Sequence, residues 1–161
     1  TTVEKPTGKP RPPLMVPKGT QLLSRDKPVK LSDDNPIAGK AEMVTDGMKE
    51  GSDGNWVEMG PGLQWVQVDL GSSTTVGKVV LKLPPSSSWA TRTQTIAISG
   101  STDGASFSTV VGASGYTFDP ATGNTVTVTF TAAARRYLRL TVTGNTGWPA
   151  GQLSDFQVYA S

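Results

Sequence analysis

The sequence predicts an all-β fold, an antiparallel jelly-roll β-sandwich of about eight strands. Several windows alternate apolar and polar residues with a period of two, which places the apolar residues on one face of a half-buried strand. Clusters of Gly, Pro, Asp and Asn, which favour turns, separate these windows. No window of about eleven or more residues shows the 3.6-residue apolar period of an amphipathic helix.

The expected strands follow one another from residue 20 to the end of the chain. Their windows are 20–24, 28–32, 64–70, 77–83, 95–100, 106–112, 124–130, 136–143 and 152–159. Short strands with frequent turns are typical of a sandwich or jelly roll. The side chains expected to face the core are Val66, Val68, Leu70, Val79, Leu81, Leu83, Val126, Val128, Phe130, Leu138, Leu140, Val142, Leu153, Phe156 and Val158.

A length of 161 residues favours one domain with a tail. Residues 1–18 hold five of the 12 prolines, so this segment is expected to be an extended linker or an arm, followed by the sandwich domain at 19–161. The composition changes near Gly71, from charged to rich in Ser, Thr and Gly. A hybrid of two related parents would produce this change, but neither half has enough strands for a sandwich of its own.

The composition excludes several classes of function. With no Cys and no His, the chain has no disulfide framework, no thiol nucleophile and no Ser-His-Asp triad. Its apolar runs are too short to span a membrane. The formal net charge of +2 comes from the first 30 residues, and the remainder is slightly acidic, which argues against nucleic acid as a partner. Arg139 alternates with Leu138 and Leu140 and is expected on a solvated face.

An enzymatic activity is not expected. The acidic residues Asp33, Asp34, Glu42, Glu50 and Glu58 lie in turn-like or irregular segments, with no sign of the paired carboxylates that acid–base chemistry needs. No candidate nucleophile has an evident base, and no lysine lies in an apolar context.

The order of several motifs resembles the discoidin domain, also called the F5/8 type C domain. The best-matched pieces are QWVQVDLG at 64–71, the I-x-x-S-x-DG pattern at 96–104, and RYLRL with the closing QLSDFQVY. The similarity covers about residues 20–161 and departs from the usual pattern between Asp46 and Gln64. It implies a jelly-roll fold and non-catalytic binding, and the sugar-binding members of this family are the family 32 carbohydrate-binding modules.

The resemblance implies a carbohydrate-binding module, cut from a secreted bacterial protein and attached to its catalytic domain. A shallow site of this kind is expected to bind a glycan or polysaccharide weakly, with a Kd of roughly 0.1–1 mM. One alternative is a discoidin-type adhesion or lipid-surface module, which would need apolar loop tips ringed by Lys or Arg. Another is a structural spacer, in which the loop tryptophans would be buried.

The resemblance also implies a structural calcium ion. In sugar-binding relatives this ion lies where an Asp-Gly turn meets an acidic residue of the last strand, and the matching residues are Asp46 and Asp155. Calcium takes six to eight oxygen ligands, so Ser52 and Asp53 of the intervening loop are further candidates. Met48 removes one expected oxygen. The alternative is that Asp46 only makes a turn and Asp155 is a solvated strand residue.

A sugar site combines exposed aromatic rings with planar hydrogen-bonding groups, because C–H patches pack on rings and hydroxyls need donors. Trp89 and Trp148 lie between strands among loop-favouring residues, whereas Trp56 and Trp65 are expected to be structural. The resemblance matches Trp148 to a stacking aromatic residue and Arg92 to a hydroxyl donor, and Asn145 could add an amide. Alternatively, Trp148 closes the sandwich and Arg92 pairs with a surface carboxylate.

Overall fold

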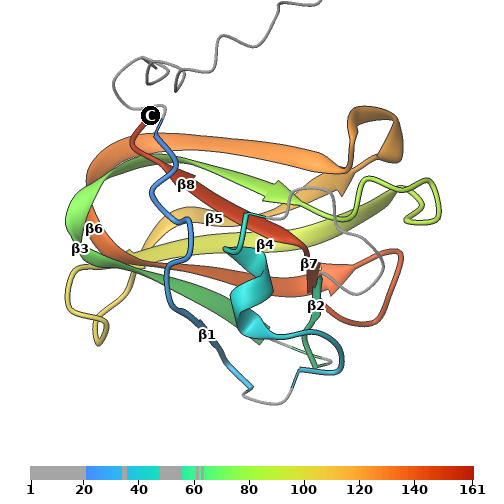
Figure 1. The fold of residues 1–161 in the computed structure, drawn as a ribbon, viewed down its shortest axis with the longest axis horizontal. Coiled ribbons are helices and arrows are strands. Elements are labelled where there is room, and N and C mark those ends of the chain that lie inside the picture. Colours follow the sequence, from blue (N-terminus) through green and yellow to red (C-terminus); the bar gives the residue numbers. More distant parts are fainter. Residues whose placement is uncertain (1–20, 34–35, 48–55, 61, 63) are drawn as a thin grey trace, which may run out of the picture.

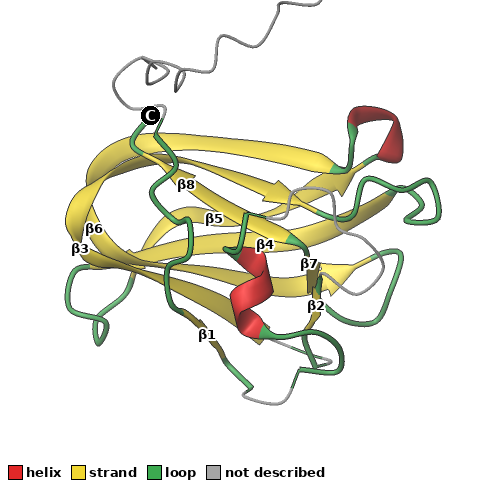
Figure 2. Cartoon of the chain, in the orientation of Figure 1, coloured by secondary structure: helices red, strands yellow, loops and turns green. Residues whose placement is uncertain are grey.

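The computed structural model describes residues 21–33, 36–47, 56–60, 62 and 64–161. Two short 3-10 helices, η1 and η2, accompany eight strands (Figures 1 and 2). The elements are β1 (Val29–Leu31), η1 (Ala41–Val44), β2 (Val57–Glu58), β3 (Gln64–Lys82), β4 (Arg92–Ser101), β5 (Ser108–Phe118), η2 (Pro120–Thr122), β6 (Thr125–Asn145), β7 (Gln152–Leu153) and β8 (Asp155–Tyr159). The expected all-β fold is confirmed, and the predicted segment 1–18 lies outside the described residues.

All strand pairs are antiparallel. The larger sheet has the order β1-β3-β6-β4-β5, with β8 added to β3, and the smaller sheet pairs β2 with β7. The first part of β3 pairs with β1 and with residues 137–142 of β6, and its last part pairs with β8 and with residues 125–129 of β6. Because β3 and β6 bend together, one sheet supplies both layers of the sandwich (Figure 1).

The bend explains why two predicted pairs of strands are each one strand in the structure. Windows 64–70 and 77–83 both belong to β3, and windows 124–130 and 136–143 both belong to β6. The register of β3 on β6 is irregular between Asp69 and Thr74, where Gly71 has a φ of 88° that favours glycine. The change in composition near Gly71 therefore falls inside one continuous strand.

The predicted strands differ from the structure in two places, at residues 20–24 and at β2. The described part of window 20–24 is not a strand, although the Leu23 N–H donates a hydrogen bond to the Val158 carbonyl at 2.9 Å. The two-residue strand β2 was not predicted, because it lies in a segment without clear alternation. In the described part of the chain, no helix has the length and hydropathy of a membrane span.

The predicted inward-facing side chains form the core. Thirteen of the fifteen are buried, and Val126 and Phe130 are half-buried against the same cluster. The period-two pattern identifies them because successive side chains of a strand point to opposite faces.

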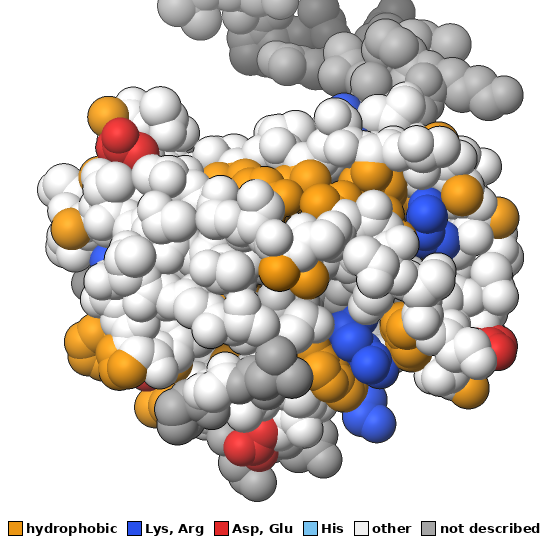
Figure 3. Space-filling view, turned by 180° about the vertical axis from the view of Figure 1, so that it is seen from behind, with side chains coloured by type: hydrophobic (Ala, Val, Ile, Leu, Met, Phe, Trp, Pro, Cys, Tyr) orange, Lys and Arg blue, Asp and Glu red, His pale blue; other side chains and the backbone are white. Residues whose placement is uncertain are grey.

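Seen from the face opposite η1, the surface is mostly uncharged, with a few Lys and Arg side chains set between hydrophobic ones (Figure 3).

Truncation in this core should destabilise the domain strongly. Leu81 is fully buried where β3 pairs with both β6 and β8. We expect Leu81→Ala to lower the free energy of unfolding by about 2–5 kcal/mol, because it removes buried apolar contacts and leaves a cavity. Denaturant unfolding checks this, with Thr127→Ala on an exposed position of β6 as the control. Equal stability of the two variants would contradict the packing described here.

Candidate functional site

A groove with three tryptophans opens at one end of the sandwich. It lies where segments 83–91 and 146–151 connect the strands, on the right in Figure 1. Its volume is about 410 Å³, and its walls are Trp56, Glu58, Ser88, Trp89, Arg92, Gly147, Trp148 and Gln152. Trp148 is 49% exposed, and Trp56 and Trp89 are half-buried. Apolar ring surface and a few polar groups are thus available to one ligand.

Trp89 is held by contacts on both of its sides. Its ring meets Trp56 edge-on, with the ring centroids 4.8 Å apart, and the Arg92 guanidinium lies over it at 5.0 Å from the centroid. The buried side chain of Asn124 donates hydrogen bonds to the carbonyls of Pro84, at 2.9 Å, and Trp89, at 3.2 Å. These bonds tie the segment before β4 to the turn that precedes β6, so Trp89 has a fixed place in the groove wall.

Arg92 begins β4, and most of its side chain is enclosed. Its Nε donates to the Ala90 carbonyl at 3.0 Å, and its Nη1 donates to Oε1 of Gln152 at 2.6 Å. Burial lowers the pKa of the Arg92 guanidinium, which nevertheless stays positively charged at neutral pH. Both acceptors are neutral, and Arg92 lines the groove, so its guanidinium places a positive charge in the groove wall.

A network of side-chain amides fixes the position of Gln152, the residue that accepts a hydrogen bond from Arg92. The Gln94 side chain donates from Nε2 to the Gln152 carbonyl at 3.0 Å and accepts at Oε1 from the Gln152 N–H at 2.9 Å. Asn145 donates to the Ala150 carbonyl at 2.9 Å and accepts from the Gly147 N–H, also at 2.9 Å. Asn145 therefore closes the loop that presents Trp148.

Trp148 and Glu58 are joined across the groove. The indole Nε1–H of Trp148 donates to Oε1 of Glu58 at 2.8 Å. Glu58 lies in β2, directly opposite Gln152 of β7. Because alternate residues of a strand share a face, Trp56 and Glu58 flank the buried Val57 and both reach the groove.

The structure thus brings together three of the four predicted ligand residues, Trp89, Arg92 and Trp148. Asn145 lines a smaller neighbouring hollow, and its amide is occupied by the loop. Sequence reasoning assigned Trp56 to the core and did not select Glu58 as a site residue. The alternation Trp56-Val57-Glu58 is too short a pattern to identify a strand by itself.

The predicted calcium ligands are only partly described. Ser52 and Asp53 lie outside the described residues, as does Met48. Asp46 is half-buried in the turn after η1, and Asp155 is buried at the start of β8, where it accepts a hydrogen bond from Gln157 at 2.7 Å. Elements η1 and β8 are in contact. Among the described residues, no three of the types His, Cys, Asp and Glu gather at one place.

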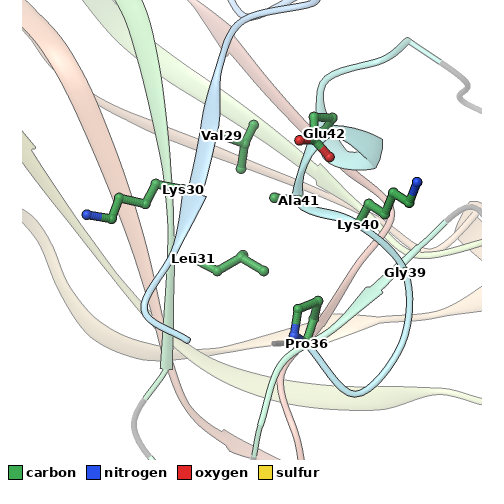
Figure 4. Close-up of a pocket in the computed structure, with 8 residues that line it drawn as sticks. All are labelled: Val29, Lys30, Leu31, Pro36, Gly39, Lys40, Ala41 and Glu42. Atoms are coloured by element: carbon green, nitrogen blue, oxygen red, sulfur yellow. The ribbon is translucent and has the colours of Figure 1, made fainter. Parts of the chain in front are cut away.

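A second cavity of about 410 Å³ lies between β1 and η1. Figure 4 shows Val29, Leu31 and Ala41 pointing into it, whereas Lys30 and Lys40 point away. Its polar groups do not converge on a common point, so the tryptophan groove is the better candidate for a binding site.

Arg139 differs from the expectation of a solvated face. It does point outward from β6, but its guanidinium lies 4.0 Å from the ring centroid of Trp65 and 3.8 Å from that of Phe107. It also donates to Oε1 of Gln67 at 2.9 Å. Burial lowers the pKa of this guanidinium. The side chain therefore joins β6, β3 and the β4–β5 connection on the outer surface.

The role of Asn145 in the loop can be tested. We expect Asn145→Ala to lower the free energy of unfolding by about 1–3 kcal/mol, because it leaves the part-buried Ala150 carbonyl without this donor and removes the bond to the Gly147 N–H. Denaturant unfolding measures this, and Thr143→Ala, an exposed neighbour on β6, is the control. If Asn145→Ala were as stable as the control and lost only ligand binding, Asn145 would be a ligand contact.

The described fold matches known proteins. The model of the F5/8 type C domain family matches residues 29–156. Chitosan-binding module 1 of a chitosanase/glucanase from Paenibacillus sp. IK-5 is 29% identical, with a TM-score of 0.63, and the match covers 86% of this chain and 98% of that one. No curated protein sequence matches the chain significantly.

Two further solved structures are similar. Truncated AlyQ, which contains CBM32 and alginate lyase domains, is 25% identical, with a TM-score of 0.65, and the match covers 82% of this chain and 31% of that one. CpGH89CBM32-5 from Clostridium perfringens, solved with GalNAc-β-1,3-galactose, is 17% identical, with a TM-score of 0.68 and coverages of 87% and 100%. The family match spans most of the chain and agrees with the sandwich described above, so the chain belongs to the F5/8 type C domain family.

Proposed function

We propose that this domain is a non-catalytic carbohydrate-binding module and that the tryptophan groove is its glycan site. The observation that carries the proposal is the meeting of Trp56, Trp89 and Trp148 with Arg92 and Glu58 in one open groove. Ring faces suit the C–H patches of sugars, and the guanidinium and carboxylate suit their hydroxyls. The similarity to a solved chitosan-binding module that is 29% identical supports this function.

The exposure of the rings favours glycan binding over the two alternatives. A spacer domain would bury the loop tryptophans, whereas Trp148 is half exposed. A lipid-surface module would surround apolar loop tips with Lys or Arg, whereas Arg92 is the cation that lines the groove among the described residues. The module would hold an attached catalytic domain near a polysaccharide, as part of a secreted bacterial protein, and raise the local concentration of substrate.

The groove predicts a specific loss of binding in Trp148→Ala. We expect at least a ten-fold loss of affinity for the cognate glycan, because the most exposed ring is removed, with a loss of about 1–3 kcal/mol in unfolding free energy, because Glu58 loses its hydrogen bond from the indole. Affinity gel electrophoresis against β-glucans, α-glucans and galactans identifies the glycan, and calorimetry measures the affinity.

The matched control for that experiment is Trp65→Ala. Trp65 stacks on Arg139 on the outer sheet face, away from the groove, so its loss should reduce stability and leave binding unchanged. Unaltered binding by Trp148→Ala to every glycan that the wild-type domain binds would refute the groove as the site.

We also propose that a calcium ion links the Asp46 turn to Asp155. Two carboxylates would supply oxygen donors of the kind that calcium prefers, and the contact between η1, which precedes the Asp46 turn, and β8, which begins with Asp155, supports the proposal. Ser52 and Asp53 are proposed as further ligands. The ion would stabilise the folded state without taking part in any chemistry.

Thermal melting tests the calcium proposal. Removal of calcium by a chelator should lower the Tm by several degrees, because binding to the folded state alone stabilises it by mass action. Readdition of calcium should restore the midpoint, and Asp46→Asn should abolish the response. Identical midpoints with and without chelator, at the same ionic strength, would exclude a structural calcium ion.

A further inference from the structure

The carboxylate of Glu58 is an unusual component of an aromatic groove. Glu58 is only 6% exposed, and its Oε1 accepts the hydrogen bond from Trp148. Within the described part of the chain, no hydrogen bond involves its Oε2. Among described side chains, the one fully enclosed polar atom without a partner is Oδ1 of Asn124, so Oε2 of Glu58 keeps contact with solvent. A ligand in the groove can therefore reach a charged acceptor.

No cation of the described chain neutralises this carboxylate. Arg92 lines the same groove, but no ion pair within 4.0 Å joins it to Glu58 among the described residues. Gln152 separates them, because it lies opposite Glu58 in the strand pair and accepts from Arg92 through its side-chain oxygen. The negative charge of Glu58 is consequently left for a ligand.

The tryptophans add to the preference for a positive charge. The face of an indole ring attracts cations and does not attract anions. Arg92 already occupies one face of Trp89, while Trp56 and Trp148 remain in the groove wall beside Glu58. A carboxylate sugar beside Glu58 would meet its negative charge, whereas an ammonium group there would donate to the unpaired oxygen within an aromatic groove wall. Arg92, which donates to Gln152 through Nη1 and to Ala90 through Nε, can donate from Nη2 to hydroxyl or ring oxygens of the sugar.

We propose that the groove selects an amino sugar with a free ammonium group, and that Glu58 is the residue that determines this specificity. The ammonium donates to Oε2 of Glu58, and the sugar ring packs on the tryptophans. The inference rests on the proposed function, since it assigns the ligand class of the same groove. A charge-assisted hydrogen bond in a partly desolvated groove is stronger than the bond that a hydroxyl or an acetamide would make there.

A ligand series that differs at one substituent tests this. Calorimetry would compare β-1,4-linked trimers of glucosamine, N-acetylglucosamine and glucose, which share a backbone and differ at C2, with a galacturonate trimer as the anionic probe. The wild-type domain should bind the glucosamine trimer at least ten-fold more tightly than each of the others. This comparison requires no variant and so does not depend on how a substitution folds.

The variant Glu58→Gln then assigns the preference to one side chain. Its amide oxygen can still accept from Trp148, while the charge is lost, so affinity for the glucosamine trimer should fall about ten-fold and the preference should disappear. Glu42→Gln is the control, because Glu42 is an exposed carboxylate on η1 outside the groove and its loss changes the net charge equally. Glu42→Gln should keep the full preference.

The outcomes separate this inference from the proposed function. Equal affinity of the wild-type domain for the amino, acetylated and neutral trimers, or tighter binding of galacturonate, would overturn the amino-sugar assignment. Retention of the preference by Glu58→Gln would overturn the role of Glu58. In each of these cases the groove remains the glycan site if Trp148→Ala abolishes binding, and it fails as the site only if Trp148→Ala binds as the wild type does.

Discussion

The reciprocal hydrogen bonds between Gln94 and Gln152 hold together the end of the sandwich at which the groove opens. The Gln94 amide donates to and accepts from the main chain of Gln152, as a neighbouring strand would. This side chain thereby connects the short sheet of β2 and β7 to β4 of the large sheet. Because both glutamines are buried, their polar atoms need these partners, and the network favours a single arrangement of the strands.

The aromatic groove is rigid for the same reason. Asn124 fixes the segment that contains Trp89, Asn145 closes the loop that contains Trp148, and Gln152 orients Arg92. Each of these anchors is an amide that bonds to backbone carbonyls or to another amide. If the groove binds a glycan as proposed, connecting segments held in this way would lose little conformational freedom on binding.

The sequence predicted the layers of the fold better than their connections. Alternation identified the core side chains because every second residue of a strand faces the same side. Leu138, Leu140 and Val142, for example, are all buried. It could not show that windows on either side of Gly71 form one bent strand, because the bend depends on pairing with a distant part of the chain.

Two residues of the candidate groove, Trp89 and Trp148, could be selected from the sequence because each stands out among loop-favouring residues. Glu58 and Trp56 reach the groove through the pairing of β2 with β7, which joins residues about a hundred positions apart, and no local pattern reveals such a pairing. Asn145 was predicted to contact the ligand, whereas its amide bonds to Ala150 and Gly147 within its own loop, and no pattern in the sequence reveals those bonds.

The direction of β8 has a consequence for attachment. β8 begins beside β7 and ends at the opposite end of the sandwich, where the C-terminal residue lies (Figure 1). The connecting segments with Trp89 and Trp148 are at the other extremity. A polypeptide that continued beyond Ser161 would leave the domain on the side remote from the indoles, so a tethered neighbour would not obstruct contact with an extended insoluble surface.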